Sequence, residues 1–242
     1  MKNELYKIWS RLGVGFNIRM TPVKNIDLEE TIVRTCIEGR RDSRVLFGMR
    51  GWLLKHHDLV NCSRLIRLTK KSEHTAVLGA ILESVINEIP RSGLQYVIKY
   101  CQRANVTEFV FHHVKDSKAL SALNTKENLA LWKKWNLISR EMESMSGAIM
   151  DKSFIIKNNT NLAIRALFGP GLKAEILSFF LNHKEGNANK ISQKICLSYE
   201  PVHSELDLFK KIGLINETKH GRSKVFAINR HFLLKVLKPL GV

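Results

Sequence analysis

One stretch near the C-terminal end constrains the fold of this chain more than any other. Apolar residues recur there at steps of four, three and three, a spacing that places them on one face of an α-helix. These residues are Val202, Leu206, Phe209 and Ile212. Gly213 follows directly, and glycine tolerates the left-handed conformation in which many helices end. The sequence therefore predicts a half-buried helix over Pro201–Ile212 that stops at Gly213.

The residues after Gly213 predict a β-hairpin with a basic tip. The run from Thr218 to Lys224 contains Gly221, and it separates two short segments with the composition of strands. The second of these segments is Val225–Ile228. Because most of the side chains at the tip are basic, we expect the hairpin to carry positive charge.

Two further helices are predicted before this helix. The break at Gly169-Pro170-Gly171 is followed by residues 172–181, whose apolar positions form one face. Asn189 is a predicted N-cap for a second helix that ends at Leu197, since its side-chain oxygen can accept a backbone N–H. Ser198 is the predicted N-cap of the third helix, where Pro201 in the first turn loses no hydrogen bond.

The rest of the chain predicts an array of helices. Residues 27–39 have Asp27 as a plausible N-cap and an apolar face that ends at Gly39, and residues 43–57 form a second helix. Residues 106–114 are rich in β-branched and aromatic residues and fit either a strand or a helical turn, and residues 126–149 return to a helical pattern. We place a domain boundary in the polar region near residue 160, which gives domains 1–160 and 161–242.

Charge is the strongest global signal. The 242 residues carry a formal net charge of +17, an excess that attracts polyanions, with nucleic acid ahead of a membrane surface. A solvated, lysine-rich surface without such a partner is the alternative. No apolar run is long enough to cross a bilayer and no secretory signal begins the chain, so we expect an intracellular protein that is cytoplasmic and nucleoid-associated.

The order of these elements resembles a known family. The sequences L-S-Y-E-P-V-H-S-E-L-D-L-F-K-K-I-G-L-I and K-H-G-R-S-K-V-F-A-I-N are similar to the winged helix-turn-helix domains of transcription regulators of the arsenic-repressor and multiple-antibiotic-resistance-repressor type. The resemblance covers about the last 75 residues. It implies a mostly α protein with an N-terminal helical array and a C-terminal winged helix-turn-helix domain with a small β-hairpin wing.

The resemblance also implies a way of binding double-stranded DNA. Pro201–Ile212 would be the recognition helix, Asn189–Leu197 the supporting helix and Lys219–Lys224 the wing. In such domains the recognition helix lies in the major groove while other groups hold phosphates. The predicted DNA-binding residues are Lys190, Lys194, Ser198, Tyr199, His203, Ser204, Lys219, His220, Arg222 and Lys224.

Acidic residues on the predicted recognition helix depart from the family's usual pattern. Glu200, Glu205 and Asp207 place negative charge on a helix that should approach a polyanion. A glutamate can accept a hydrogen bond from the cytosine amino group, so one acid is compatible with base reading. The competing hypothesis is therefore a winged helix that binds a protein, or RNA loosely. We expect the N-terminal domain to supply homodimerisation or partner contacts.

Other chemistry finds little support in the sequence. Adjacent residues point in different directions, so the pairs His56-His57 and His112-His113 do not form a metal site by themselves. The cysteines are far apart without a C-x-x-C pair, which predicts free thiols rather than disulfides or zinc; they are Cys36, Cys62, Cys101 and Cys196. No phosphate loop, H-E-x-x-H or nucleophile elbow is present, so we predict no cofactor and no enzymatic activity.

Overall fold

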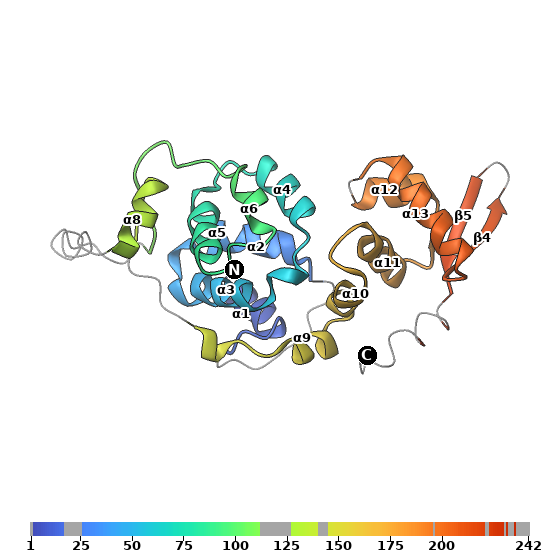
Figure 1. The fold of residues 1–242 in the computed structure, drawn as a ribbon, viewed down its shortest axis with the longest axis horizontal. Helices are drawn as coiled ribbons and strands as arrows, with labels where there is room; N and C mark the ends of the chain where they lie inside the picture. The colour runs from blue at the N-terminus through green and yellow to red at the C-terminus, as the bar shows by residue number, and fades with distance from the viewer. Residues whose placement is uncertain are drawn as a thin grey trace. The chain divides into compact units, whose positions relative to one another are not determined.

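A computed structural model describes residues 2–16, 26–111, 127–139, 145–195, 197–220 and 223–229, together with residues 231 and 235. The protein is mostly helical and has a small antiparallel sheet of three strands near its C-terminus (Figure 1). The chain forms two compact units, unit 1 (Met1–Phe154) and unit 2 (Ile155–Val242). In the part of the chain that is described, every helix is too short or too polar to span a membrane.

Unit 1 is an assembly of short helices. Its elements are α1 (Lys2–Arg11), α2 (Leu28–Glu38), η1 (Gly39–Arg41), α3 (Ser43–His56), η2 (His57–Leu59), α4 (Cys62–Lys71), α5 (Ala76–Glu88), α6 (Leu94–Ile98), β1 (Glu108–Phe109), α8 (Glu127–Lys134), β2 (Leu137–Ile138), η4 (Ser146–Ala148) and the start of α9 (Lys152–Asn158). The predicted helices at 27–39 and 43–57 are confirmed as α2 and α3. Asp27 is confirmed as the N-cap of α2, since its side chain accepts the backbone N–H of Glu30 at 3.1 Å.

Tryptophans fill the core of unit 1. Trp9, Trp52 and Trp132 have no exposed surface, and Trp135 is 6% exposed. The indole N–H of Trp9 donates to Thr35 Oγ1 at 2.8 Å, and that of Trp52 donates to the carbonyl oxygen of Leu12 at 2.7 Å. These bonds satisfy the polar edges of the rings, so the full apolar area stabilises the fold.

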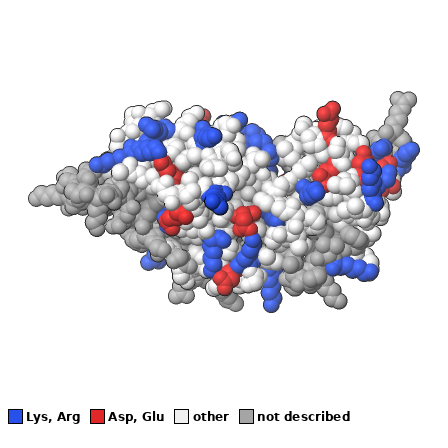
Figure 2. Space-filling view, viewed as in Figure 1, with Lys and Arg blue, Asp and Glu red and all other residues white. Residues whose placement is uncertain are grey.

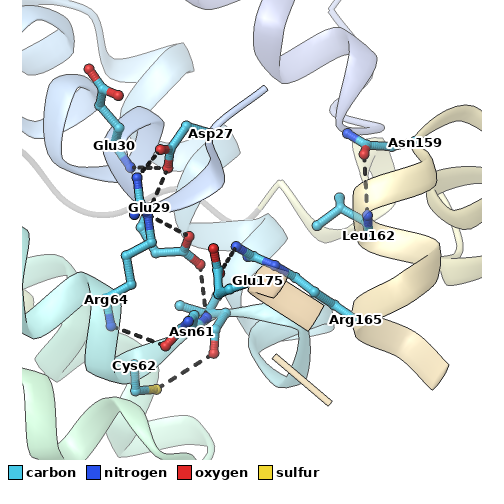
Figure 3. A network of polar contacts seen from close by, with 11 residues as sticks. Asp27, Glu29, Glu30, Asn61, Cys62, Arg64, Asn159, Leu162, Arg165 and Glu175 are labelled. Atoms are coloured by element: carbon cyan, nitrogen blue, oxygen red, sulfur yellow. Dashed lines mark hydrogen bonds and ion pairs between the residues drawn. The ribbon is translucent and has the colours of Figure 1, made fainter. Parts of the chain in front are cut away.

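A buried polar network joins α2 to α4 (Figure 3). Glu29 is fully buried and its Oε1 accepts the backbone N–H of Asn61 at 2.8 Å. Arg64 forms an ion pair with Asp27, and its Nε lies 3.8 Å from Glu29 Oε2. A buried carboxylate is tolerated only when such partners surround it. The network therefore fixes the first turn of α4 on the first turn of α2.

The prediction of helix throughout 126–149 is wrong. Within the described residues, helix continues only to Lys134, and Asn136 then takes a left-handed conformation at φ 54°. A left-handed residue cannot continue a right-handed helix. Leu137–Ile138 instead forms β2, which pairs in parallel with β1 (Glu108–Phe109). Residues 106–114 thus contain a two-residue strand in their described part.

Unit 2 begins within α9 and combines helices with the three-stranded sheet. Its further elements are α10 (Thr160–Phe168), α11 (Leu172–Asn182), β3 (Glu185–Gly186), α12 (Ala188–Ile195), α13 (Tyr199–Lys211), β4 (Ile215–His220) and β5 (Ser223–Ile228). The three helices α11, α12 and α13 pack against one another, and β4 and β5 lie side by side (Figure 1). In the antiparallel sheet β5 lies between β3 and β4.

Helix ends in unit 2 follow the predicted chemistry with two exceptions. Gly213 has φ 76°, so the predicted left-handed stop after α13 is confirmed. The cap of α12 is Asn187 rather than Asn189, because Asn187 Oδ1 accepts the backbone N–H of Lys190 at 2.8 Å. Ser198 occupies the N-cap position of α13, but its side chain makes no capping hydrogen bond. The apolar stripe of α13 is buried at Val202, Leu206 and Phe209, whereas Ile212 is 53% exposed.

Candidate nucleic-acid interface

Lys190 and Lys194 extend from the outer face of α12. The opposite face of this helix buries Ile191 and Ile195 in the core, which turns both lysines into solvent. They stand four residues apart and therefore lie on the same side of the helix. Among the described carboxylates, none forms an ion pair with either lysine. Both cations are thus available to an external anion.

The N-terminal half of α13 brings four predicted residues together. Ser198, Tyr199 and Ser204 are exposed, and His203 is partly exposed. The rings of Tyr199 and His203 lie 5.4 Å apart between centroids, and His203 Nδ1 is 3.3 Å from Asp207 Oδ2. This end of the helix therefore presents a phenol, an imidazole and two hydroxyls, all of which can donate hydrogen bonds.

The structure changes the interpretation of the acidic residues on α13. The side chain of Glu205 is only 14% exposed and its Oε1 lies 4.0 Å from Lys173 Nζ on α11, so this carboxylate does not point outward. Asp207 is beside His203, as described above. Glu200 is exposed in the first turn, where the helix dipole favours negative charge. Of the three acids, Glu205 alone is turned inward; Glu200 is exposed, and the side chain of Asp207 is 41% exposed beside a histidine that is a cation only when protonated.

A cluster of charges occupies the hairpin. Lys219 and Lys224 are direct partners across β4 and β5, and like charges in this arrangement destabilise a sheet. Glu217 reduces that repulsion. Its Oε2 accepts from Lys210 Nζ at 2.7 Å, and its Oε1 is 4.0 Å from Lys224 Nζ. The hydrogen bond from Lys210 lowers the pKa of Glu217, and the charges of Lys210, Lys224 and Lys219 lower it further.

Three lysines thus surround one carboxylate, and we call Lys210, Lys219, Lys224 and Glu217 the hairpin cluster. Figure 2 shows basic and acidic side chains intermixed at the part of the molecule that carries β4 and β5. The cluster has a positive balance. Of its members, Lys210 and Glu217 were not predicted from the sequence, because their contact depends on how α13 and β4 meet across Gly213.

The remaining predicted residues have no described side chains. The backbone of His220 ends β4, and Arg222 lies outside the described residues. The predicted site residues that are described therefore form three local groups: the outer face of α12, the first half of α13 and the hairpin cluster.

The described residues add no candidate for metal binding or for thiol chemistry. Within the described ranges, no group of three or more His, Cys, Asp or Glu side chains is placed to hold a metal ion. The pair His112-His113 and Cys196 lie outside these ranges. Cys36, Cys62 and Cys101 are free thiols. Burial raises the pKa of Cys36 well above its usual range and that of Cys101 to about 12, which lowers the reactivity of both.

Comparison with known proteins adds no functional assignment. No family model, no curated protein and no solved structure matches the chain.

Proposed function

We propose that unit 2 is a winged helix-turn-helix domain that binds duplex DNA, and that the protein acts as a transcription regulator. Three packed helices followed by a two-stranded hairpin, with β3 as a third strand, support this proposal. In it, α13 is the recognition helix, α12 is the supporting helix and the hairpin is the wing. Tyr199, His203 and Ser204 would reach base edges or phosphates, while Lys190 and Lys194 would contact the phosphate backbone.

The distribution of ion pairs is the observation that carries this proposal. Glu205, Asp207 and Glu217 each lie beside a cation or a histidine within unit 2. By contrast, Lys190, Lys194 and Lys219 form no ion pair with a described carboxylate. Glu205 and Glu217 thus lie next to lysines inside the unit, while Glu200 stays exposed. The three lysines remain available to phosphates.

A second function is favoured by one separate observation. Leu208 and Ile212 are 42% and 53% exposed and lie four residues apart, Leu208 in the last turns of α13 and Ile212 directly after the helix. Such a pair is typical of a contact with an apolar partner. In this alternative, unit 2 is a protein-interaction module and its charge serves solubility or a loose RNA contact.

Salt-dependent binding of a fluorescently labelled duplex by the full chain tests the first proposal. Neutralising one phosphate contact reduces the slope of log K against log salt by about 0.9 for duplex DNA. We expect Lys190→Gln with Lys194→Gln to reduce the slope by about two. Lys157→Gln is the matched control, since Lys157 is an exposed lysine on α9 outside the three local groups. It should leave the slope nearly unchanged.

Removing a negative charge near the lysines should have the opposite effect on duplex binding. Glu217→Gln keeps the size of the side chain and removes the negative charge from the hairpin cluster. Because Lys210, Lys219 and Lys224 then face the solvent without it, we expect tighter duplex binding and a slope that increases by up to about one. Absence of duplex binding at low salt would refute the DNA proposal. Duplex binding that is insensitive to both changes would place the DNA contact elsewhere.

A further inference from the structure

Unit 1 carries an exposed aromatic and basic surface that the duplex proposal does not use. Tyr96 and Tyr100 are 55% and 43% exposed, so part of each ring is accessible to a ligand. Tyr96 lies in α6, and Tyr100 lies in the turn that follows, where its backbone N–H donates to the carbonyl oxygen of Val97 at 3.0 Å. Both rings therefore belong to one short segment, residues 96–100.

A lysine accompanies each ring. Lys70 Nζ, from the last turn of α4, lies 4.3 Å from the centroid of the Tyr100 ring. Lys99 Nζ lies 5.6 Å from the centroid of the Tyr96 ring. These are cation–π distances. We call Tyr96, Tyr100, Lys70 and Lys99 the tyrosine platform.

The surroundings of the platform are basic. Lys71 is the last residue of α4 and Arg103 follows α6 in the chain, and both are exposed. The exposed carboxylate nearest to Lys71 in the sequence is that of Glu73. No described carboxylate forms an ion pair with Lys70, Lys71, Lys99 or Arg103. Positive charge therefore exceeds negative charge around the two rings.

The platform rests on a fixed support. Helices α4 and α6 pack against each other, and α6 buries Leu94 and Val97 beneath its exposed rings. The polar network of Glu29, Asn61 and Arg64 holds the opposite end of α4 (Figure 3). A rigid support reduces the entropy that a binding surface loses when it engages a ligand.

We propose that the tyrosine platform binds single-stranded nucleic acid. Bases would stack on Tyr96 and Tyr100, while Lys70, Lys99 and their basic neighbours attract the phosphates. Aromatic rings beside a cationic track are what such strands require, because every base has a stacking face and every nucleotide a negative charge. A duplex keeps its bases paired and stacked, so the exposed rings favour single strands.

A polar hollow is lined by residues that follow Tyr100 in the chain. It has a volume of about 490 Å³, and its lining includes Gln102, Arg103 and Asn105 together with the carboxylates of Glu73 and Glu108. The amide side chains can both donate and accept hydrogen bonds. A base next to the stacked nucleotides would meet hydrogen-bonding groups here, whereas the two carboxylates disfavour a phosphate.

Binding of the full chain to fluorescently labelled oligothymidylate and oligouridylate, each fifteen nucleotides long, tests the platform when it is measured by fluorescence anisotropy. Removing one base–aromatic stack typically weakens binding about tenfold. Tyr96→Leu with Tyr100→Leu should therefore weaken binding about 100-fold at every salt concentration, with little change in the salt slope. A loss of this size with either oligonucleotide would support the proposal.

A double lysine variant should change the salt dependence of single-strand binding, unlike the double tyrosine variant. Lys70→Gln with Lys99→Gln should reduce the salt slope by about 1.4, because each phosphate contact contributes about 0.7 with single strands. Phe109→Leu, at an exposed ring on β1 outside the platform, is the matched ring control and should leave single-strand binding unchanged. Tryptophan fluorescence of each variant should match the unmodified protein, which shows that unit 1 is folded.

Three results would overturn the proposal. They are no binding of either oligonucleotide at low salt, unchanged binding by the double tyrosine variant, and binding of poly-glutamate as tight as that of the oligonucleotides. The last result would identify a surface for anions in general, including acidic proteins. The duplex proposal is tested by other residues and another ligand, so each proposal can fail alone.

Discussion

The hairpin cluster of unit 2 and the tyrosine platform of unit 1 are both basic, yet their lysines have different neighbours. In the hairpin cluster, Lys210 and Lys224 share the carboxylate of Glu217. In the platform, Lys70 and Lys99 lie over aromatic rings. A lysine beside a carboxylate is part of an internal charge balance, whereas a lysine beside an exposed ring combines with it to match a nucleotide. Net charge alone would not separate these two surfaces.

Unfolding one unit should have the largest effect, because it should remove one binding activity and leave the other. Phe209 is 2% exposed in the core of unit 2, and Phe209→Ala should destabilise that unit by about 3–5 kcal/mol. We expect loss of duplex binding with single-strand binding retained. All four tryptophans lie in unit 1, so the urea transition followed by tryptophan fluorescence should change little.

The neighbouring position provides the control for this experiment. Leu208→Ala changes an exposed residue of the same helix and should alter stability by at most about 0.5 kcal/mol. If Phe209→Ala moves the tryptophan transition to clearly lower urea as well as abolishing duplex binding, the two units do not act separately and the comparison is wrong.

The converse change acts on unit 1. A methyl group at Gly79 in α5 would overlap the ring of Trp135, which is held because its Nε1 donates to Glu83 Oε2 at 2.7 Å. Overpacking of this kind costs about 1–3 kcal/mol. Gly79→Ala should therefore move the tryptophan transition to lower urea and weaken single-strand binding under mildly denaturing conditions. Duplex binding should be unaffected.

Gly147→Ala is the matched control in the same unit. Among the described residues other than its two chain neighbours, no heavy atom lies within 4 Å of the position that its Cβ would occupy. The tryptophan transition of this variant should stay close to that of the unmodified protein. A similar loss of stability in both glycine variants would show that the contact with Trp135 is not the cause.

A smaller effect is expected from pH. His56 is buried, its Nε2 lies 3.0 Å from the carbonyl oxygen of Met150, and its Nδ1 has no hydrogen-bond partner among the described residues. Burial lowers the pKa of His56 in the folded protein, while the unfolded chain keeps a pKa of about 6.5. The unfolded state therefore binds more protons near this pH, so the stability of unit 1 should fall as pH falls from 7 through 6.5.

His56→Gln tests this assignment. Glutamine can still donate to the Met150 carbonyl, but it cannot take up a proton. Urea unfolding followed by tryptophan fluorescence at pH 7.5 and 5.5 should show a smaller pH effect in this variant, while His74→Gln, at an exposed histidine, should keep the full effect. An equal pH effect in all three proteins would exclude His56 as its source.

Sequence predicted the features of this protein that depend on local chemistry. The cap at Asp27 and the left-handed stop at Gly213 follow from one residue and its neighbours, and both are confirmed. Asn187 and Asn189 have the same capping chemistry two residues apart, so the sequence did not distinguish them. The parallel pairing of Glu108 with Leu137 joins residues too distant in the chain for periodicity to reveal.

The same distinction applies to the candidate sites. The lysines of α12 and of the hairpin were found from the sequence because they flank recognisable elements. The inward direction of Glu205 depends on Lys173 of α11, and Tyr100 meets Lys70 only because α4 packs on α6. These contacts decide which charges are available to a ligand, and they arise from packing between elements.

The most direct test measures the affinity of two double variants for both ligands. We predict that Lys190→Gln with Lys194→Gln weakens binding of the duplex and leaves binding of oligothymidylate nearly unchanged. Tyr96→Leu with Tyr100→Leu should weaken binding of oligothymidylate and leave binding of the duplex nearly unchanged. If either pair of substitutions weakens both ligands by the same factor, or if neither changes any affinity, two separate nucleic-acid surfaces do not exist.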